Sequence, residues 1–121
     1  MRAQMRNDIT QGELTLLLST AESQELADIV VRANNGESLT PAERLRVGLR
    51  SESTFRLWQN VHFQGRNGTY DEEEFRKHLD TMEQVLQGSR AFVDYWCRNS
   101  QIYPVQFQDE INKRIPSGAC D

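Results

Sequence analysis

The chain has 121 residues, enough for one domain with a modest hydrophobic core. Apolar residues make up 37% of it, charged residues 26%, and the formal net charge is -4. This acidic balance argues against nucleic-acid binding, which normally requires a basic surface. The sequence has no apolar run of about 18 residues, so we expect no membrane-spanning segment within it.

Two cysteines occur, Cys97 inside an apolar segment and Cys120 near the end of the sequence. Without a recognisable spacing, two cysteines indicate neither a disulfide framework nor a zinc site. We therefore expect both to be unpaired, as in a protein of a reducing compartment. The first ten residues contain arginines but no apolar stretch behind them, and this argues against a signal peptide.

Apolar side chains recur near helical spacing over residues 2–20, which predicts an amphipathic or stalk helix within residues 1–20. A second, shorter helix follows Ser23. Asn35 and Gly36 end this helix, because Asn and Gly tolerate the left-handed conformation that a C-terminal cap requires.

The longest predicted helix begins at Thr40. Pro41 suits the first helical position, and Glu43 completes a capping box with Thr40. The helix extends to a glycine-containing turn at residues 65–68. We expect its inward apolar stripe to consist of Leu45, Leu49, Phe55, Trp58 and Val61.

Three further helices follow this turn. Asp71 and Glu74 form a second capping box, and the fourth helix ends at Gly88. A fifth helix begins at Ser89, and a last short helix lies between Pro104 and Pro116. Short loops between five or six helices predict an all-α bundle around the long central helix. We expect this helical domain to cover residues 21–116, with a flexible tail over residues 117–121.

No motif in the sequence predicts a metal or cofactor site. Asn67 to Phe75 resembles the second half of an EF-hand loop, but two ligand positions would fall on Phe63 and Gly65, which lack side-chain oxygens. We therefore interpret this stretch as a turn followed by a capped helix. His62 and His78 have no further ligand at a zinc-binding spacing. Catalysis is not predicted either, because no nucleophile has a base nearby in the sequence.

Five residues are candidates for a ligand or partner surface. Arginines along the central helix form either a face for an acidic partner or ion pairs within the domain. Aromatic residues at helical spacing line either a pocket or the core. The candidates are Trp58, His62, Trp96, Arg46 and Arg50.

The order of segments also resembles a group of uncharacterised bacterial helical proteins. The resemblance covers roughly residues 10–115 and rests on Leu39-Thr-Pro-Ala-Glu-Arg44, on Phe55-Arg-Leu-Trp-Gln-Asn-Val-His-Phe-Gln64, on Gly68, Asp71 and Phe75, on Ser89-Arg90 before Trp96, and on Phe107. Members of this group usually have one N-terminal transmembrane helix before a small helical domain. The resemblance therefore implies a membrane-anchored domain without an assigned activity.

Two functions follow as hypotheses. The first is a non-enzymatic module that acts by contact with a protein partner or by self-association. It would lie in the cytoplasm, tethered to the inner face of the plasma membrane, since Arg2 and Arg6 would then lie beside the anchor. The second is a small-ligand sensor with a pocket between the central and fifth helices, near Trp58, His62 and Trp96.

Overall fold

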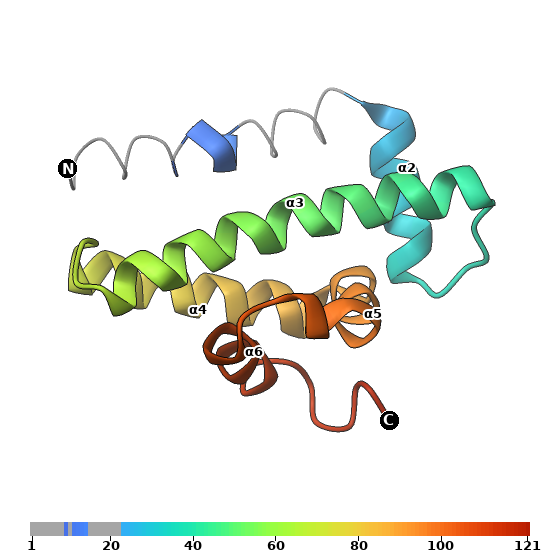
Figure 1. Cartoon of the computed structure of the whole chain (residues 1–121). Helices are drawn as coiled ribbons and strands as arrows, with labels where there is room; N and C mark the ends of the chain where they lie inside the picture. Colours follow the sequence, from blue (N-terminus) through green and yellow to red (C-terminus); the bar gives the residue numbers. More distant parts are fainter. Residues whose placement is uncertain (1–8, 10, 15–22) are drawn as a thin grey trace.

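The computed structural model describes residue 9, residues 11–14 and residues 23–121. These residues form helices and no strand (Figure 1). The predicted all-α bundle around a long central helix is confirmed. The predicted helix over residues 1–20 lies largely outside the described residues, of which residues 9 and 11–14 are helical. The elements are α2 (Gln24–Asn34), α3 (Pro41–Arg66), α4 (Glu72–Gly88), α5 (Arg90–Asn99), a short 3-10 helix η1 (Ser100–Ile102) and α6 (Val105–Asn112).

Local sequence signals set the ends of α3, the 26-residue helix on which the others pack (Figure 1). The Thr40 hydroxyl accepts a hydrogen bond from the Glu43 backbone N–H at 3.2 Å, and the Glu43 carboxylate accepts one from the Thr40 N–H at 2.9 Å. This capping box satisfies two N–H groups at the start of the helix. Beyond the other end, Gly68 adopts a positive φ of 71°, which a residue with a side chain rarely does.

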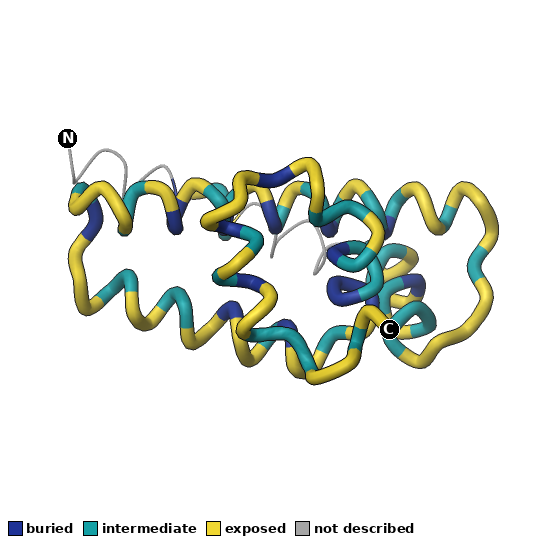
Figure 2. The backbone as a smooth tube through the Cα atoms, turned by 60° about the horizontal axis from the view of Figure 1, so that its bottom comes forward, coloured by how far each residue is buried: buried dark blue, intermediate teal, exposed yellow. Residues whose placement is uncertain are grey.

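The main core lies where the C-terminal half of α3 meets α4, α5 and α6. Phe55 and Trp96 are both fully buried and stack with ring centroids 5.2 Å apart. Tyr103 and Phe107, which follow α5 in the sequence, pack on Trp96. The buried positions lie on the inner sides of the helices (Figure 2). A smaller cluster of Ile29, Val47 and Ala91 joins α2 to α3 and α5.

The predicted inward stripe of α3 is wrong in its N-terminal half. Leu45 is 63% exposed and Leu49 is 53% exposed, whereas Val47 and Ser51 are buried. Ser51 can occupy a core position because its hydroxyl donates to the Val47 carbonyl at 2.9 Å. Because the buried Ser51 is polar, it interrupts the apolar pattern of the buried face. The sequence pattern therefore assigns Leu45 and Leu49 to the core instead.

The prediction of unpaired cysteines is also wrong. Cys97 on α5 and Cys120 form a disulfide, with their Cα atoms 5.3 Å apart. Residues 117–121 were predicted to be a flexible tail, but the disulfide fastens this segment to α5, and Ala119 packs against the core. The pairing depends on the return of the chain after α6, which cysteine spacing alone does not reveal.

Candidate functional site

The five predicted site residues do not form one site. Trp58, His62 and Trp96 are buried, with exposed fractions of 7%, 5% and 0%. Arg46 is partly exposed and forms an ion pair with Glu25 on α2 at 2.8 Å. The remaining residue, Arg50, lies with its guanidinium carbon 5.0 Å from the Phe92 ring centroid.

Trp96 is a core residue. Its indole N–H donates to the Asn112 side chain at 2.8 Å, which ties α5 to the end of α6. Beside it, the Tyr95 and Tyr103 hydroxyls are hydrogen-bonded at 2.8 Å. Burial and this hydrogen bond raise the pKa of Tyr103 above its ordinary value. These contacts satisfy the polar atoms of the aromatic core and leave Trp96 in a structural role.

His62 belongs to a largely buried ionic cluster of His62, Glu110 and Arg114, here called the Glu110 cluster. One Glu110 carboxylate oxygen lies 3.6 Å from His62 Nε2, and the other accepts a 2.8 Å hydrogen bond from Arg114 Nε. Arg114 also donates to the Leu79 carbonyl at 3.2 Å. The cluster therefore joins α3 and α4 to α6 and the residues that follow it.

Burial and charge act in opposite directions within the Glu110 cluster. Burial lowers the pKa of His62, and the Glu110 charge only partly offsets this effect. For Glu110, burial alone would raise the pKa, but the Arg114 hydrogen bond and the nearby positive charges hold it below its ordinary value. The geometry thus supports a negatively charged Glu110 and a neutral His62 at neutral pH.

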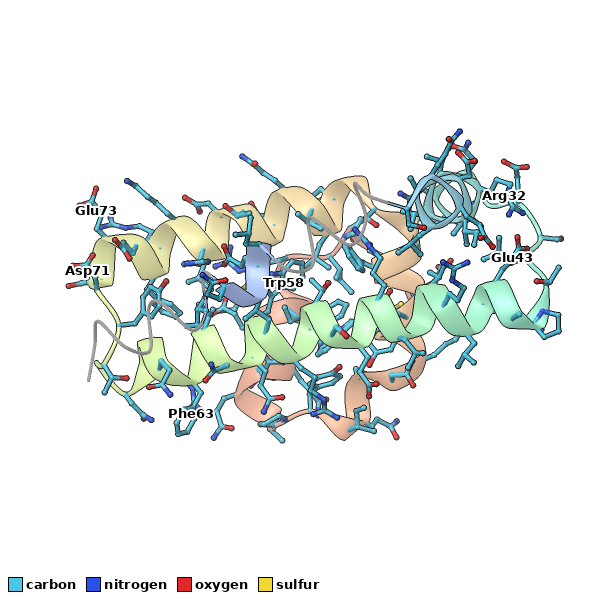
Figure 3. All side chains as sticks on the ribbon, turned by 90° about the horizontal axis from the view of Figure 1, so that it is seen from above. Arg32, Glu43, Trp58, Phe63, Asp71 and Glu73 are labelled. Carbon is cyan, nitrogen blue, oxygen red and sulfur yellow. A yellow bond between two sulfur atoms is a disulfide. The ribbon has the colours of Figure 1, made fainter. Side chains whose placement is uncertain are left out.

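Trp58 lines a hollow of about 420 Å³ between α3 and α4. Figure 3 shows Trp58 in the space between these helices. Apolar walls come from Leu57, Val85 and Phe92, and polar groups from Arg50, Lys77 and His78, among others. Neither His62 nor Trp96 lines this hollow, so it differs from the pocket expected between the central and fifth helices.

His78 gains partners that the sequence did not reveal. Its Nε2 lies 2.7 Å from the Tyr70 hydroxyl, and its Nδ1 lies 3.2 Å from a Glu13 oxygen. The order of hydroxyl, imidazole and carboxylate resembles a nucleophile, a base and an orienting group. Tyr70, however, is only 6% exposed. We therefore interpret these contacts as a link between residues 11–14 and α4.

A second surface lies on the N-terminal half of α3, which extends beyond α5 (Figure 1). Leu45 and Leu49 are exposed there, one turn apart. Between them, no described heavy atom outside the helix lies within 4 Å of the position that a Cβ on Gly48 would take. Arg44 and Glu52 lie four residues to either side of Gly48. These five residues are called the α3 outer face below.

The α3 outer face borders an open groove of about 570 Å³. Asp94, Tyr95 and Arg98 of α5 form the opposite wall, together with the loop between α2 and α3. The sequence missed this surface because it placed Leu45 and Leu49 in the core. Two observations together could have revealed it, namely the glycine between the leucines and the opposite charges on either side.

Within the described residues, no group of three or more His, Cys, Asp or Glu side chains could hold a metal ion. In the same part of the chain, no helix is long and apolar enough to cross a membrane. Comparison with family models, curated proteins and solved structures yields no match to this chain.

Proposed function

We propose that this chain is a non-enzymatic helical interaction domain that binds a protein partner through the α3 outer face. The observation that carries the proposal is the pair of exposed leucines, Leu45 and Leu49, one turn apart on the longest helix. Single exposed apolar residues are common on protein surfaces, but a pair beside a groove is typical of a helix-binding face.

Gly48 supports the same proposal. Helices approach each other most closely where one of them carries a glycine, since no side chain separates the two backbones. Gly48 lies beside both leucines, and the described structure leaves the space above it empty. A partner helix could therefore seat its side chains over Gly48 while Leu45 and Leu49 pack along its side.

A photo-reactive amino acid in place of Leu49 tests this proposal in intact cells that express the full chain. Illumination is expected to produce covalent adducts of defined mass. The control carries the same amino acid in place of Val31, which is 57% exposed on α2. If position 49 forms no adduct, or only those that position 31 also forms, the α3 outer face is not an interaction surface.

The disulfide supports a location for this domain. We infer that the domain works in an oxidising compartment and not in the cytoplasm, because disulfides between protein thiols are rare in reducing compartments. The expected cytoplasmic location rested on Arg2 and Arg6. Rapid acid quenching of cells followed by thiol labelling separates the two locations. If the disulfide is present in the cell, protein that has not been treated with a reductant takes up no thiol label. Two labels per chain would mean that both thiols are free, as expected in the cytoplasm.

The membrane anchor remains a proposal that only the resemblance to anchored helical proteins supports. An anchored protein would fractionate with membranes and would be released by detergent but not by high salt or alkali. Recovery of the native protein in the fraction without membranes would contradict it.

A second candidate function, small-ligand binding, is favoured by the hollow at Trp58. Its apolar walls would suit a short apolar chain, and Arg50 and Lys77, which line it together with Glu13 and Glu74, could pair with a carboxylate on that chain. Octanoate is a suitable calorimetric probe. Val85→Trp should fill the hollow and abolish binding, while Val105→Trp, at an exposed position on α6, should leave it unchanged. If octanoate does not bind to the unmodified chain, the hollow at Trp58 no longer favours ligand binding as a function.

A further inference from the structure

We infer that the partner of the α3 outer face is a second copy of this chain, with the two α3 helices antiparallel and a two-fold axis near Gly48. This inference rests on the proposed function and names its partner. It is carried by the order of charges and leucines along the helix, which complements itself when reversed.

The charges on the α3 outer face lie in an order that complements itself when the helix is reversed. Arg44, Gly48 and Glu52 are spaced by four residues and therefore lie along one row of the helix surface. When two copies run antiparallel across Gly48, Arg44 of each copy lies opposite Glu52 of the other. The contact thus brings together two pairs of opposite charges, and a parallel arrangement would instead place like charges together.

Both charged side chains are accessible at this surface. Arg44 is exposed and uses Nη1 to bond the Leu39 carbonyl at 3.0 Å, which leaves its other donors for a partner. Glu52 is 43% exposed, and its nearest cation, Arg56, is 3.9 Å away. That separation is beyond hydrogen-bond distance, so Glu52 can accept a bond from the second copy.

The leucines provide the apolar part of the contact. Leu45 and Leu49 form the row beside Arg44, Gly48 and Glu52. A two-fold axis perpendicular to the plane of the two helices keeps both leucine rows on the same side. With a rise of about 1.5 Å per residue, the four leucines then alternate between the copies at intervals of about 3 Å. They form one continuous cluster and are removed from water together.

The geometry also keeps the main cores of the two copies apart. The N-terminal half of α3 extends beyond α5 (Figure 1), and the main core is built around the C-terminal half. In the antiparallel arrangement the two cores lie at opposite ends of the contact. Contact centred on one helical segment and the groove beside it implies a small interface and a dimer that dissociates on dilution.

Sedimentation equilibrium of the full chain over a range of concentrations tests this inference. The average mass is expected to rise from one copy toward two. Leu49→Glu should lower the self-association constant at least tenfold, because it places two carboxylates in the apolar cluster. The matched control is Val105→Glu, since Val105 is 66% exposed on α6, and it should leave the constant unchanged. Circular dichroism verifies that both variants remain folded.

Charge exchange tests the register. Arg44→Glu or Glu52→Arg alone should weaken the dimer, and the double variant should restore it, because each copy then carries both exchanged charges. A single-copy mass at all concentrations would overturn the inference, as would a dimer unaffected by Leu49→Glu or a double variant that fails to restore association. The proposed function would survive these results if the photo-reactive residue at position 49 captured a different protein.

Discussion

Glu110 carries a negative charge in a place where an isolated charge would be costly. Its side chain is 12% exposed, and Arg114, its closest partner, is 17% exposed. Among the described residues, the Glu110 cluster joins α3, α4 and α6 with the residues that follow α6. Removing Glu110 takes away the closest partner of the Arg114 guanidinium, which then keeps, in the described part of the chain, only the Leu79 carbonyl and Glu83, whose carboxylate lies 3.7 Å away. Breaking a largely buried pair of this kind costs more than the pair contributes.

Glu110→Gln is therefore expected to lower the free energy of unfolding by about 3 kcal/mol. Glu73→Gln provides the matched control. Glu73 pairs with Lys77 at 3.5 Å, but both side chains are more than 70% exposed. Its loss should cost less than about 1 kcal/mol, because water screens the pair. Urea unfolding measures both changes, and equal effects in the two variants would show that burial does not set the contribution of Glu110.

The same cluster predicts how stability depends on pH. Burial holds the pKa of His62 in the folded chain below its ordinary 6.5, so the unfolded chain takes up the proton first as pH falls. The free energy of unfolding should therefore be highest above pH 6.5 and decrease below it. Glu110 acts in the same direction below pH 4.5, because its folded pKa is also lowered. A hydrogen bond from Arg32 lowers the pKa of Glu43 to about 2, so protonation of Glu43 adds to the loss of stability in acid.

Urea unfolding between pH 8 and pH 5 measures the contribution of His62. In His62→Gln the decrease below pH 6.5 should become shallower, because the group that titrates there is absent. Below pH 4.5, where further measurements extend the series, both proteins should still lose stability, since Glu110 and Glu43 are present in both. A pH profile identical to that of the unmodified chain would show that the imidazole does not change its protonation on unfolding in this range.

At the scale of the helix, α3 shows what the sequence can and cannot predict. Its start was predictable because Thr40, Pro41 and Glu43 act locally. Its inward face was predicted correctly from Phe55 onward, where large apolar residues dominate. Toward the N-terminus, the buried face contains Ser51, and the surface carries Leu45 and Leu49. Packing against α2 and α5 determines which residues of this half of α3 are buried, and the spacing of apolar residues within α3 does not encode that packing.

Two glycines of α3 allow the same change to be compared in two environments. A Cβ on Gly48 would meet no described atom outside the helix within 4 Å, whereas one on Gly65 would lie 2.3 Å from the Phe75 ring. Gly48→Ala should therefore raise the free energy of unfolding by about 0.5–1 kcal/mol, since alanine favours the helix more than glycine does.

Gly65→Ala should lower the free energy of unfolding despite the same gain in helix propensity. The added methyl group must displace Phe75, and overpacking of this kind typically costs about 1–3 kcal/mol. Thermal unfolding of dilute protein measures both variants without a contribution from association. A stabilising effect of Gly65→Ala would show that Phe75 moves aside freely and that the α3–α4 contact is looser than the structure indicates.

At the scale of the whole molecule, the Cys97–Cys120 disulfide links two segments that are 23 residues apart. The loop it closes contains η1 and α6, and α6 contributes the buried residues Phe107 and Ile111 to the core. The sequence did not predict the bond, because pairing depends on how α6 returns the chain to α5. The disulfide stabilises the fold mainly by restricting the conformations of the unfolded chain. Its contribution to the free energy of unfolding therefore cannot be derived from contacts in the folded state.

Reduction is therefore expected to lower the free energy of unfolding by about 3 kcal/mol, in line with a loop of this length. The double variant Cys97→Ala, Cys120→Ala should show a similar loss in the absence of reductant and no further loss in its presence. Urea unfolding of both proteins with and without a thiol reductant provides the four values. If the unmodified chain were equally stable in both states, or if the double variant responded to reductant, the disulfide would not be the element that holds α6 and the C-terminal segment to α5.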